Sequence, residues 1–312
     1  MYYNNLPGYD RCQKKEINDA GSNWNNLKQF LALIKRKMLD IPYASLSPAQ
    51  KLDIYLPEKG QGPFPVIVSI HGGAFMFGDK GDAQARPMLE GLNRGYAAVS
   101  INYRMSGEAK FPALVHDLKA ALRWIRAEAE RYNFDPGKIA VWGGSAGGYQ
   151  AAMAGVSYGV PELEDLSLGN PGESSRVQAV VDWFGPTDFL KMDEQIIACG
   201  FKLRLEDAHN GERSPESLLM GRQITLIPEM VKSANPETYI NVSAPPFLIQ
   251  HGTKDDTVPC LQSVYFAEKL TAVLGPEKVT LDLLEGARHG DAQFGSPENL
   301  ERVFGFLDTN LK

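Results

Sequence analysis

The sequence predicts an α/β fold with a mostly parallel central sheet, helices on both faces of the sheet and a small helical cap. Short, continuously apolar runs recur along the chain, as expected for strands that are covered on both faces. Segments with helical periodicity separate these runs, and such alternation is typical of a parallel sheet. One long stretch without a strand pattern, residues 187–240, interrupts the alternation late in the chain.

Residues 1–40 are predicted to form a separate N-terminal helical segment. Apolar side chains between Leu27 and Met38 recur at helical spacing, with basic side chains between them, which indicates an amphipathic helix. We expect this segment to pack on the main body, and a lid or a dimer contact is the alternative. Residues 41–312 are predicted to form the main domain.

The strands of this domain follow from the apolar runs. The first, residues 51–56, alternates between polar and apolar side chains and ends at Pro57, so we expect a half-buried strand on the outside of the sheet. Further strands are predicted at residues 65–70, 96–101, 139–142, 177–181, 247–249 and 279–284. The clearest helices are predicted at residues 113–131, 261–274 and 297–311.

The stretch at residues 187–240 is interpreted as the cap. It contains short helical patterns at residues 189–197 and 215–220, mixed charge and several glycines. Insertions of this length in compact domains tend to be functional or disordered. An ordinary surface excursion is the alternative.

Composition excludes several classes of protein. The chain has 312 residues, with 32 basic and 38 acidic side chains and a net charge of −6. A nucleic-acid partner is not expected, because phosphate binding needs a basic face. A membrane partner is not expected either, because no apolar run reaches the ~18 residues of a membrane span.

The N-terminal residues lack the basic and apolar regions of a signal peptide. We therefore expect a cytoplasmic location, unless an export signal has been lost by truncation. The three cysteines, Cys12, Cys199 and Cys260, are too few and too scattered for a disulfide framework, and their spacing indicates neither a metal site nor a redox motif. At least one thiol is free unless chains pair, and a reducing compartment is the simpler interpretation. The sequence leaves the oligomeric state open, and a homo-oligomer is compatible with it.

The strongest chemical signal is the G-x-S-x-G motif around Ser145. It follows a predicted buried strand and begins an apolar helix, the context of a nucleophile elbow. Gly143 and Gly147 relieve the crowding of such a tight turn, and the helix N-terminus favours developing negative charge. Ser145 is thus the candidate nucleophile. A glycine-rich turn that binds phosphate is the alternative.

A serine nucleophile needs a base and a carboxylate that orients it. His289 follows the last predicted strand in a glycine-flanked loop, so it is the candidate base; a solvent-exposed loop histidine is the alternative. Asp255 and Asp256 follow the preceding strand, and the D-x-x-V-P spacing favours Asp255 as the acid. Asp256 is then a turn or N-cap residue, and His251, at the strand end, is expected to be structural.

Residues 69–75 supply the expected oxyanion hole. This segment, S-I-H-G-G-A-F, follows an early buried strand and matches the HGGG-type loop. We assign the backbone N–H groups of Gly73 and Ala74, together with that of Ala146 after the nucleophile. His71 is expected to fix the loop by hydrogen bonding. A tight turn without a ligand is the alternative.

Further motifs extend the pattern over about residues 50–311. These motifs are Phe77-Gly78-Asp79-Lys80, Asn102-Tyr103-Arg104, Phe111-Pro112-Ala113, His116-Asp117, residues 236–239 and Ala244-Pro245-Pro246-Phe247. With the oxyanion loop, the elbow and the Asp255 and His289 loops, the chain resembles the hormone-sensitive-lipase-like esterases of the α/β-hydrolase fold. Within that group it is similar to small bacterial esterases that remove acetyl or feruloyl groups from plant polysaccharides. Ala74 stands where the group often has a third glycine, and in residues 1–40 and 187–240 we place no motif of the group.

The resemblance implies a serine carboxylesterase that hydrolyses short-chain acyl esters, expected to be acetyl or feruloyl esters of sugars or xylo-oligosaccharides, with neither an organic cofactor nor a metal. An arylformamidase-like or peptidase-like amide hydrolase using the same residues is one alternative, and a non-catalytic binding protein is another. Sugars or aryl acids could stack on Phe75, Trp183 and Phe184, which are the candidate pocket residues. Core packing is the alternative for each of these three.

Overall fold

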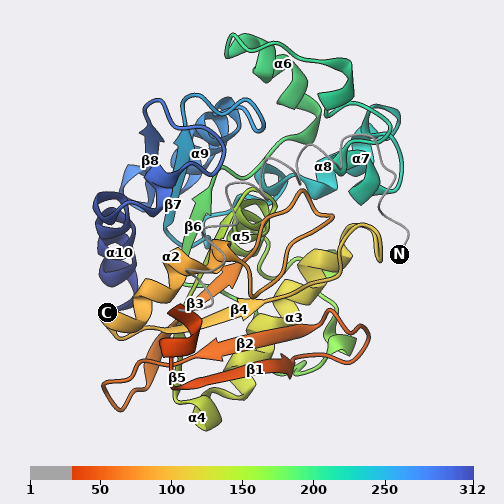
Figure 1. The fold of residues 1–312 in the computed structure, drawn as a ribbon. Helices are drawn as coiled ribbons and strands as arrows, with labels where there is room; N and C mark the ends of the chain where they lie inside the picture. Colours follow the sequence, from red (N-terminus) through yellow and green to blue (C-terminus); the bar gives the residue numbers. More distant parts are fainter. Residues whose placement is uncertain (1–29) are drawn as a thin grey trace.

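The computed structural model describes residues 30–312 of the chain, and Figure 1 shows their arrangement. A single eight-stranded sheet runs through this part, in the order β1-β2-β4-β3-β5-β6-β7-β8. The strands are β1 (Lys37–Pro42), β2 (Lys51–Tyr55), β3 (Phe64–Ile70), β4 (Ala97–Ile101), β5 (Phe134–Gly144), β6 (Ala179–Trp183), β7 (Phe247–Gly252) and β8 (Val279–Leu284). The six strands β4, β3, β5, β6, β7 and β8 are parallel to one another. Strand β1 is antiparallel to β2, and β2 is antiparallel to β4. The mostly parallel sheet predicted from the sequence is confirmed.

Two predictions at the N-terminal end of the sheet are wrong. Residues 30–33 are helical, but residues 37–42 form strand β1, so Met38 lies in the sheet and not in the predicted helix. Because β1 takes the edge position, β2 is covered on both sides and is almost wholly buried, although a half-buried outer strand was expected. The rest of the predicted N-terminal helix lies outside the described residues.

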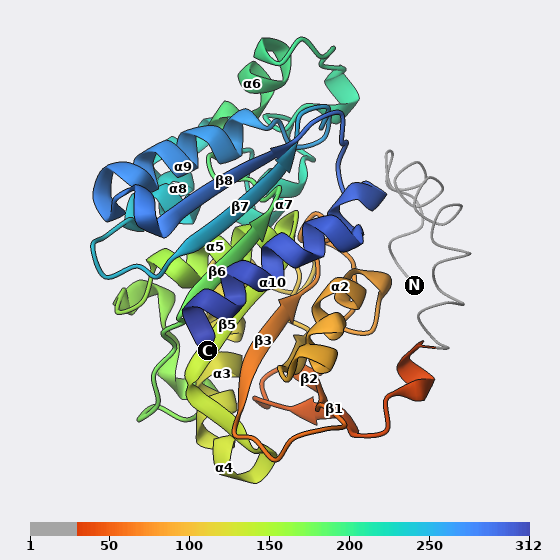
Figure 2. The ribbon, with the colours of Figure 1, turned by 90° about the vertical axis from the view of Figure 1, so that its left-hand side faces the viewer.

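Helices cover both faces of the sheet. They are α2 (Arg86–Leu89), α3 (Ala113–Ala127), α4 (Ala129–Tyr132), α5 (Ala146–Val156), α6 (Met192–Ala198), α7 (Pro215–Met220), α8 (Pro228–Ala234), α9 (Leu261–Leu274) and α10 (Pro297–Leu311). Short 3-10 helices lie between them at Ala83–Ala85, Glu90–Arg94, Pro161–Leu163, Leu166–Leu168, Phe189–Lys191, Leu205–Asp207, Ile224–Leu226, Pro236–Tyr239, Pro276–Lys278 and Ala292–Gly295. Figure 2 shows α2 and α10 on one face of the sheet, with α3 and α5 behind it.

The alternation of side chains along the strands explains these two layers. On β3, Val66 and Val68 join the core that α3, α5 and α9 cover, whereas Ile67 joins the core beneath α10. On β5, Val141 and Trp142 divide in the same way. Successive strand residues point to opposite faces, so continuously apolar strands need helices on both sides. The continuously apolar runs therefore form strands that are covered on both faces, as predicted from the sequence.

The helical insertion, residues 187–240, contains α6, α7 and α8 and no strand, as the sequence predicted. Figures 1 and 2 show α6 beyond the carboxyl ends of β6 to β8. His209 of the insertion reaches the loop after β7, where its ring Nε2 lies 3.0 Å from the carbonyl oxygen of Thr257. The insertion is therefore in contact with the end of the sheet where the candidate catalytic loops lie.

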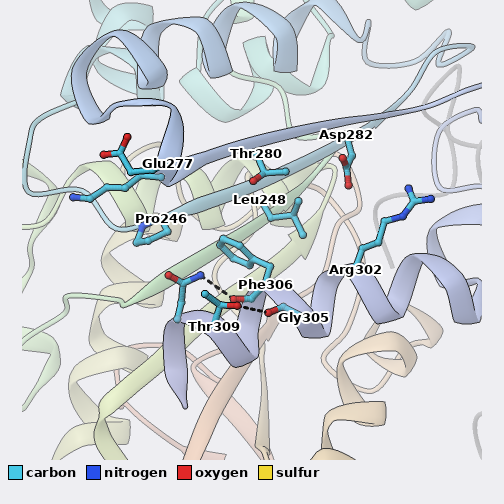
Figure 3. Close-up of a pocket in the computed structure, with 11 residues that line it drawn as sticks. Pro246, Leu248, Glu277, Thr280, Asp282, Arg302, Gly305, Phe306 and Thr309 are labelled. Atoms are coloured by element: carbon cyan, nitrogen blue, oxygen red, sulfur yellow. Dashed lines mark hydrogen bonds between the residues drawn. The ribbon is translucent and has the colours of Figure 1, made fainter.

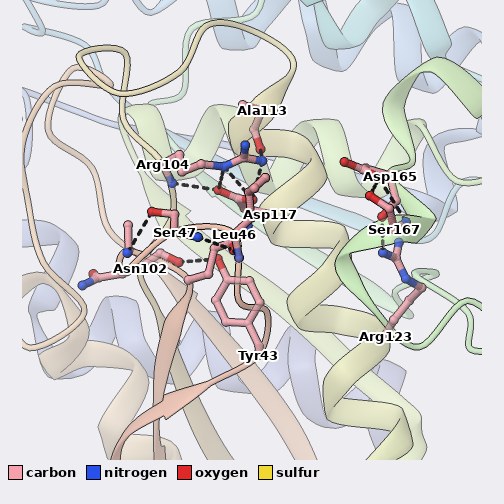
Figure 4. A network of polar contacts seen from close by, with 12 residues as sticks. Tyr43, Leu46, Ser47, Asn102, Arg104, Ala113, Asp117, Arg123, Asp165 and Ser167 are labelled. Carbon is pink, nitrogen blue, oxygen red and sulfur yellow. Dashed lines mark hydrogen bonds and ion pairs between the residues drawn. The ribbon is translucent and has the colours of Figure 1, made fainter.

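A buried polar network fastens the loop after β4 to α3 (Figure 4). The guanidinium of Arg104 donates to both carboxylate oxygens of Asp117, and the Arg104 backbone N–H donates to Oδ2 at 2.8 Å. Asp117 is fully buried and also accepts from Gln50 at 2.7 Å. A buried carboxylate needs partners of this kind. The network thus fixes Arg104 and the segment before it, in which Tyr103 contacts His71 of the oxyanion loop.

Candidate active site

Ser145 lies in the tight turn between β5 and α5. Its backbone has φ 56° and ψ −123°, a sparsely populated conformation that costs on the order of 1–3 kcal/mol. The turn is compact because a Cβ atom added to Gly147 would lie 2.1 Å from the carbonyl oxygen of Ile70. The N–H of Ser145 donates to the carbonyl of Trp183 at 2.9 Å, which ties the turn to the end of β6. These features match the elbow that the sequence predicted.

The segment after β3 lies directly beside this turn. A Cβ atom added to Gly72 would lie 3.2 Å from the Cβ atom of Ser145. Gly73 and Ala74 both have positive φ, 116° and 51°, and their N–H groups donate to no partner within residues 30–312. A side chain at Gly73 would collide with the carbonyl oxygen of Phe77, 2.0 Å from the added Cβ. The loop thus presents free backbone donors next to the serine.

His71 and two neighbours hold this loop from below. The His71 ring stacks on Tyr103 with centroids 4.5 Å apart, and the Tyr103 hydroxyl donates to the His71 carbonyl at 2.8 Å. His71 Nδ1 lies 2.7 Å from the carbonyl oxygen of Gly72, and Gln84 accepts from the Gly72 N–H at 2.8 Å. Burial lowers the pKa of His71, although the hydrogen bond to Gly72 opposes this. These contacts agree with the structural role expected for His71.

Asp255 and His289 meet at the ends of β7 and β8. His289 Nδ1 donates to Asp255 Oδ2 at 2.6 Å. The carboxylate is 1% exposed, while the imidazole side chain is 21% exposed. The structure therefore joins the predicted base to the predicted acid over 34 positions of sequence.

Further donors fix the Asp255 carboxylate. Its Oδ1 accepts from the N–H groups of Thr257 and Val258, both at 2.9 Å. Burial opposes ionisation, but the charge of His289 and the hydrogen bonds of His251 and His289 outweigh it and hold the pKa of Asp255 well below its usual range. Asp256 instead turns outward, where its Oδ2 lies 2.5 Å from Arg288 Nη2. The geometry therefore favours Asp255 over Asp256.

His251 is an additional partner that sequence patterns did not reveal. Its Nε2 lies 3.3 Å from Asp255 Oδ2 and 2.9 Å from the carbonyl of Val258, and its Nδ1 lies 2.7 Å from Ser263 Oγ. The sequence placed His251 at a strand end and predicted a structural role, which its complete burial supports. Its contact with the acid could not be inferred, because no spacing rule links a strand-end histidine to the following loop.

The ring of Phe184 lies close to both the elbow and the histidine. Its ring lies 4.6 Å from that of His289, and a Cβ atom added to Gly144 would lie 3.0 Å from Phe184 Cζ. The two other candidate pocket residues are held in the core. The Trp183 indole donates to Gln250 at 2.7 Å, and the Phe75 ring packs against Tyr149. This packing favours the core alternative for Phe75 and Trp183. Phe184 is also part of the core, at 7% exposure, and lies next to the candidate base.

Within residues 30–312, no group of three or more His, Cys, Asp and Glu side chains could hold a metal ion. No helix in the same part of the chain is both long enough and apolar enough to cross a membrane.

A cavity of about 430 Å³ lies away from the candidate site, where β7 and β8 meet α10 (Figure 3), and none of the candidate site residues lines it.

Comparison with known proteins agrees with this geometry. The family model BD-FAE matches residues 52–270. The probable carboxylic ester hydrolase LipM of Mycobacterium tuberculosis is 34% identical over 239 residues, which cover 75% of this chain and 52% of LipM. The esterase LipC of the same organism is 32% identical over 254 residues, which cover 78% of this chain and 57% of LipC. The chain thus spans about half the length of the curated relatives that it matches.

Solved structures show the same similarity. A bifunctional GH43-CE protein of Bacteroides eggerthii superposes with a TM-score of 0.79 at 35% identity, covering 88% of this chain and 35% of that one. A truncated carbohydrate esterase from gut microbiota superposes with a TM-score of 0.77 at 32% identity, and the match covers 89% of this chain and 96% of that chain. Thermogutta terrifontis esterase 2, phosphonylated by sarin, superposes with a TM-score of 0.69 at 30% identity, and the match covers 88% of this chain and 95% of that chain.

Fold and relatives together place the chain among the proteins of the α/β-hydrolase fold, and the relatives are named as esterases and carboxylic ester hydrolases. The resemblance stated from the sequence is thereby confirmed at the level of this class. The chain belongs to the BD-FAE family, whose model covers more than two thirds of its length.

Proposed function

We propose that this protein hydrolyses short-chain acyl esters of sugars, acetyl or feruloyl esters of xylo-oligosaccharides in particular, by way of an acyl-enzyme on Ser145. The observation that carries the proposal is the 2.6 Å hydrogen bond between His289 and Asp255 at the rim where Ser145 is presented. A serine hydroxyl is a weak nucleophile on its own, and an oriented imidazole is the usual means of activating it.

His289 and Asp255 would act on Ser145 as follows. His289 takes the proton from Ser145 Oγ through Nε2 as the oxygen attacks the ester carbonyl. Asp255 accepts from Nδ1–H, keeps the imidazole in the required tautomer and stabilises the imidazolium that forms. His289 returns the proton to the leaving alcohol, and water repeats the sequence on the acyl-enzyme. The low pKa of Asp255 keeps its carboxylate ionised throughout.

The oxyanion is assigned to the backbone N–H groups of Gly73, Ala74 and Ala146. The first two are unpaired within the described residues and lie beside Ser145, and Ala146 begins α5, where the helix dipole favours negative charge. Removing one such donor in other enzymes costs about 3 kcal/mol of transition-state stabilisation. Unpaired donors in a loop whose Gly72 lies against Ser145 support the assignment.

The substrate class rests on the relatives and on one aromatic contact. Two of the structural neighbours are described as a GH43-CE protein and as a carbohydrate esterase. Phe184 lies beside His289 and is 7% exposed, so a small apolar edge of its ring is open to a sugar or an aryl acyl group. An ester of an oligosaccharide is therefore the proposed partner of the site, in preference to a lipid or a nucleic acid.

The nucleophile is tested with a fluorophosphonate probe followed by peptide mass spectrometry. We expect one label per chain, located on Ser145 and abolished in Ser145→Ala. Ser157→Ala, at the opposite end of α5, is the matched control and should label normally. Labelling of another residue, or a Ser145→Ala variant that keeps its esterase rate, would contradict the proposal.

The substrate is tested by product analysis on acetylated and feruloylated xylo-oligosaccharides. We expect the loss of acetyl or feruloyl groups, and a panel of p-nitrophenyl esters should show the highest kcat/KM for short acyl chains. Aryl formamides are included because the same residues could hydrolyse an amide. Faster turnover of the formamides than of every ester would reject the esterase assignment and favour the amide hydrolase.

A further inference from the structure

The fold brings together two cysteines that lie 61 positions apart in the sequence. The Sγ atoms of Cys199 and Cys260 are 3.9 Å apart, and both thiols are free and partly exposed. Cys199 ends α6 in the helical insertion, and Cys260 precedes α9, five positions after Asp255. We propose that these residues form an oxidation site, in which a disulfide fastens the insertion to the segment that carries the candidate acid.

The surrounding contacts hold the two thiols in place. One turn before Cys199, Gln195 accepts a hydrogen bond from Gln262 Nε2 at 2.6 Å, and Gln262 lies two positions after Cys260. On the other side, His209 Nε2 lies 3.0 Å from the carbonyl oxygen of Thr257. The same two segments are thus joined on both sides of the thiol pair. A sulfur–sulfur bond requires an approach of roughly 2 Å, which side-chain rotation and small backbone shifts can supply.

Burial raises the pKa of Cys260 to about 11, and its neighbour Cys199 adds to the effect. The thiolate is the reactive form of a cysteine, so oxidation of this pair should be faster at alkaline pH. One thiol of the pair reacts with the oxidant, and the other resolves the product.

Hydrogen peroxide is a sufficient oxidant for both steps. One of the two sulfurs attacks one peroxide oxygen, which gives a sulfenic acid and releases one water molecule. The other sulfur then attacks the oxidised sulfur, the sulfur–oxygen bond breaks, and a second water molecule leaves. Two thiols and one peroxide thus yield one disulfide and two water molecules, and a dithiol reductant reverses the change.

The product is detected by treating the full-length protein with hydrogen peroxide and mapping its tryptic peptides without reduction. Trypsin should release peptides 192–202 and 255–269, which hold Cys199 and Cys260 respectively. We expect these two peptides to be linked and the number of titratable thiols per chain to fall from three to one. Cys12→Ser is the matched control, because it removes the remaining thiol and should leave the link intact.

Cys199→Ser and Cys260→Ser should each abolish the link, and alanine at the same positions provides a second pair of variants if either serine variant unfolds. The bond closes a loop that contains the whole of α7 and α8. Oxidation of the wild-type chain should therefore raise Tm by roughly 5 °C, reversibly with dithiothreitol, and should leave Tm of Cys199→Ser unchanged.

Three unlinked thiols after oxidation, or a link through Cys12, would overturn the proposal. A link without any rise in Tm would show that the bond does not fasten the insertion. None of these readouts needs turnover, so a failure here is distinguishable from a failure of the esterase assignment.

Discussion

Two adjacent aspartates on the loop after β7 differ in burial, partners and charge environment. Asp255 is buried against His251 and His289, while the Asp256 side chain is 43% exposed and pairs with Arg288. A buried carboxylate that orients an imidazole has no substitute in solvent, whereas an exposed ion pair contributes little.

We therefore expect Asp255→Asn to lower kcat/KM for p-nitrophenyl acetate by about 10⁴-fold, because the amide favours the wrong tautomer of His289. Asp256→Asn, the matched control, should change it less than about threefold. Equal losses in the two variants would contradict the assignment of the acid.

A third carboxylate, that of Asp182, predicts how the free energy of unfolding depends on pH. Asp182 in β6 is completely buried, and its Oδ2 has no hydrogen-bond partner within residues 30–312. Burial raises the pKa of Asp182 to about 6, against the opposing effects of the Gly185 N–H and His251. Because this folded-state pKa lies above the unfolded value, the folded state loses stability as pH rises from about 4 through about 6.

Asp182→Asn removes that titration while keeping the shape of the side chain. We expect the variant to have a higher Tm than the wild type at pH 8 and a similar Tm at pH 4.5, measured by thermal unfolding at matched ionic strength. A variant that is less stable than the wild type at pH 8 would show that the Asp182 charge is stabilised by the fold.

The sequence identified Ser145, Asp255 and His289 because each belongs to a local motif at a strand end. The contacts that hold the oxyanion loop could not be read from local motifs. Tyr103 reaches His71 over 32 positions, and Gln84 reaches Gly72 from a separate loop. The two cysteines were judged too scattered, because sequence spacing carries no information about which loops meet above a parallel sheet.

At the scale of elements, the buried strands and long helices were predictable and the edges were not. The bounds of α9, α10 and β8 agree with the prediction, because their apolar patterns are long or lie between clear turn residues. Strand β1 has the sequence Lys-Met-Leu-Asp-Ile-Pro, which lacks a clean twofold alternation. Its strand character comes from pairing with β2, a tertiary effect that outweighs local pattern.

The helical insertion carries an ionic contact that depends on pH. His209 Nδ1 lies 3.2 Å from Glu216, its backbone N–H donates to Asp193, and its Nε2 faces the Thr257 carbonyl. Burial disfavours the charged imidazole, but Glu216 and Asp193 outweigh this and raise the pKa of His209 to about 9. Since the unfolded value is lower, the contribution is complete below about pH 6.5 and is lost as pH rises through about 9.

The wild-type chain should therefore lose stability between pH 7 and pH 10, by at most about 3 kcal/mol from this group. His209→Gln should be less stable at pH 7 and should show a flatter dependence over that interval in urea unfolding. His116→Gln, which alters a surface histidine bonded to the Glu162 carbonyl, is the control and should keep the wild-type slope. The same alkaline loss in His209→Gln would refute the role of this pair.

At the scale of the whole molecule, the antiparallel pair β1–β2 closes one edge of a sheet that is otherwise parallel. The family model begins at residue 52, so β1 lies before the matched region. An uncovered strand edge exposes unpaired backbone groups and promotes association. Strand β1 also brings Asp40 to Lys80 at 2.9 Å, which links the edge to the loop after the oxyanion segment.

Two shortened chains test this role. A chain that begins at residue 43 lacks β1, and we expect it to be less stable than a chain that begins at residue 30 by roughly 3 kcal/mol or more, because the β1–β2 hydrogen bonds and the Lys80 partner are lost. Urea unfolding and sedimentation of the two chains provide the comparison. Equal stability and equal sedimentation would show that the edge needs no cover.

The backbone conformation at Ser145 has a consequence for the evolution of heat resistance in this protein. The sheet and the helix hold the candidate nucleophile in an unfavourable backbone conformation. Substitutions that relax this turn would increase the free energy of unfolding, but they would also remove the reactivity of the serine. Selection at high temperature should therefore accumulate substitutions in helices and surface loops and leave the five residues of the elbow unchanged.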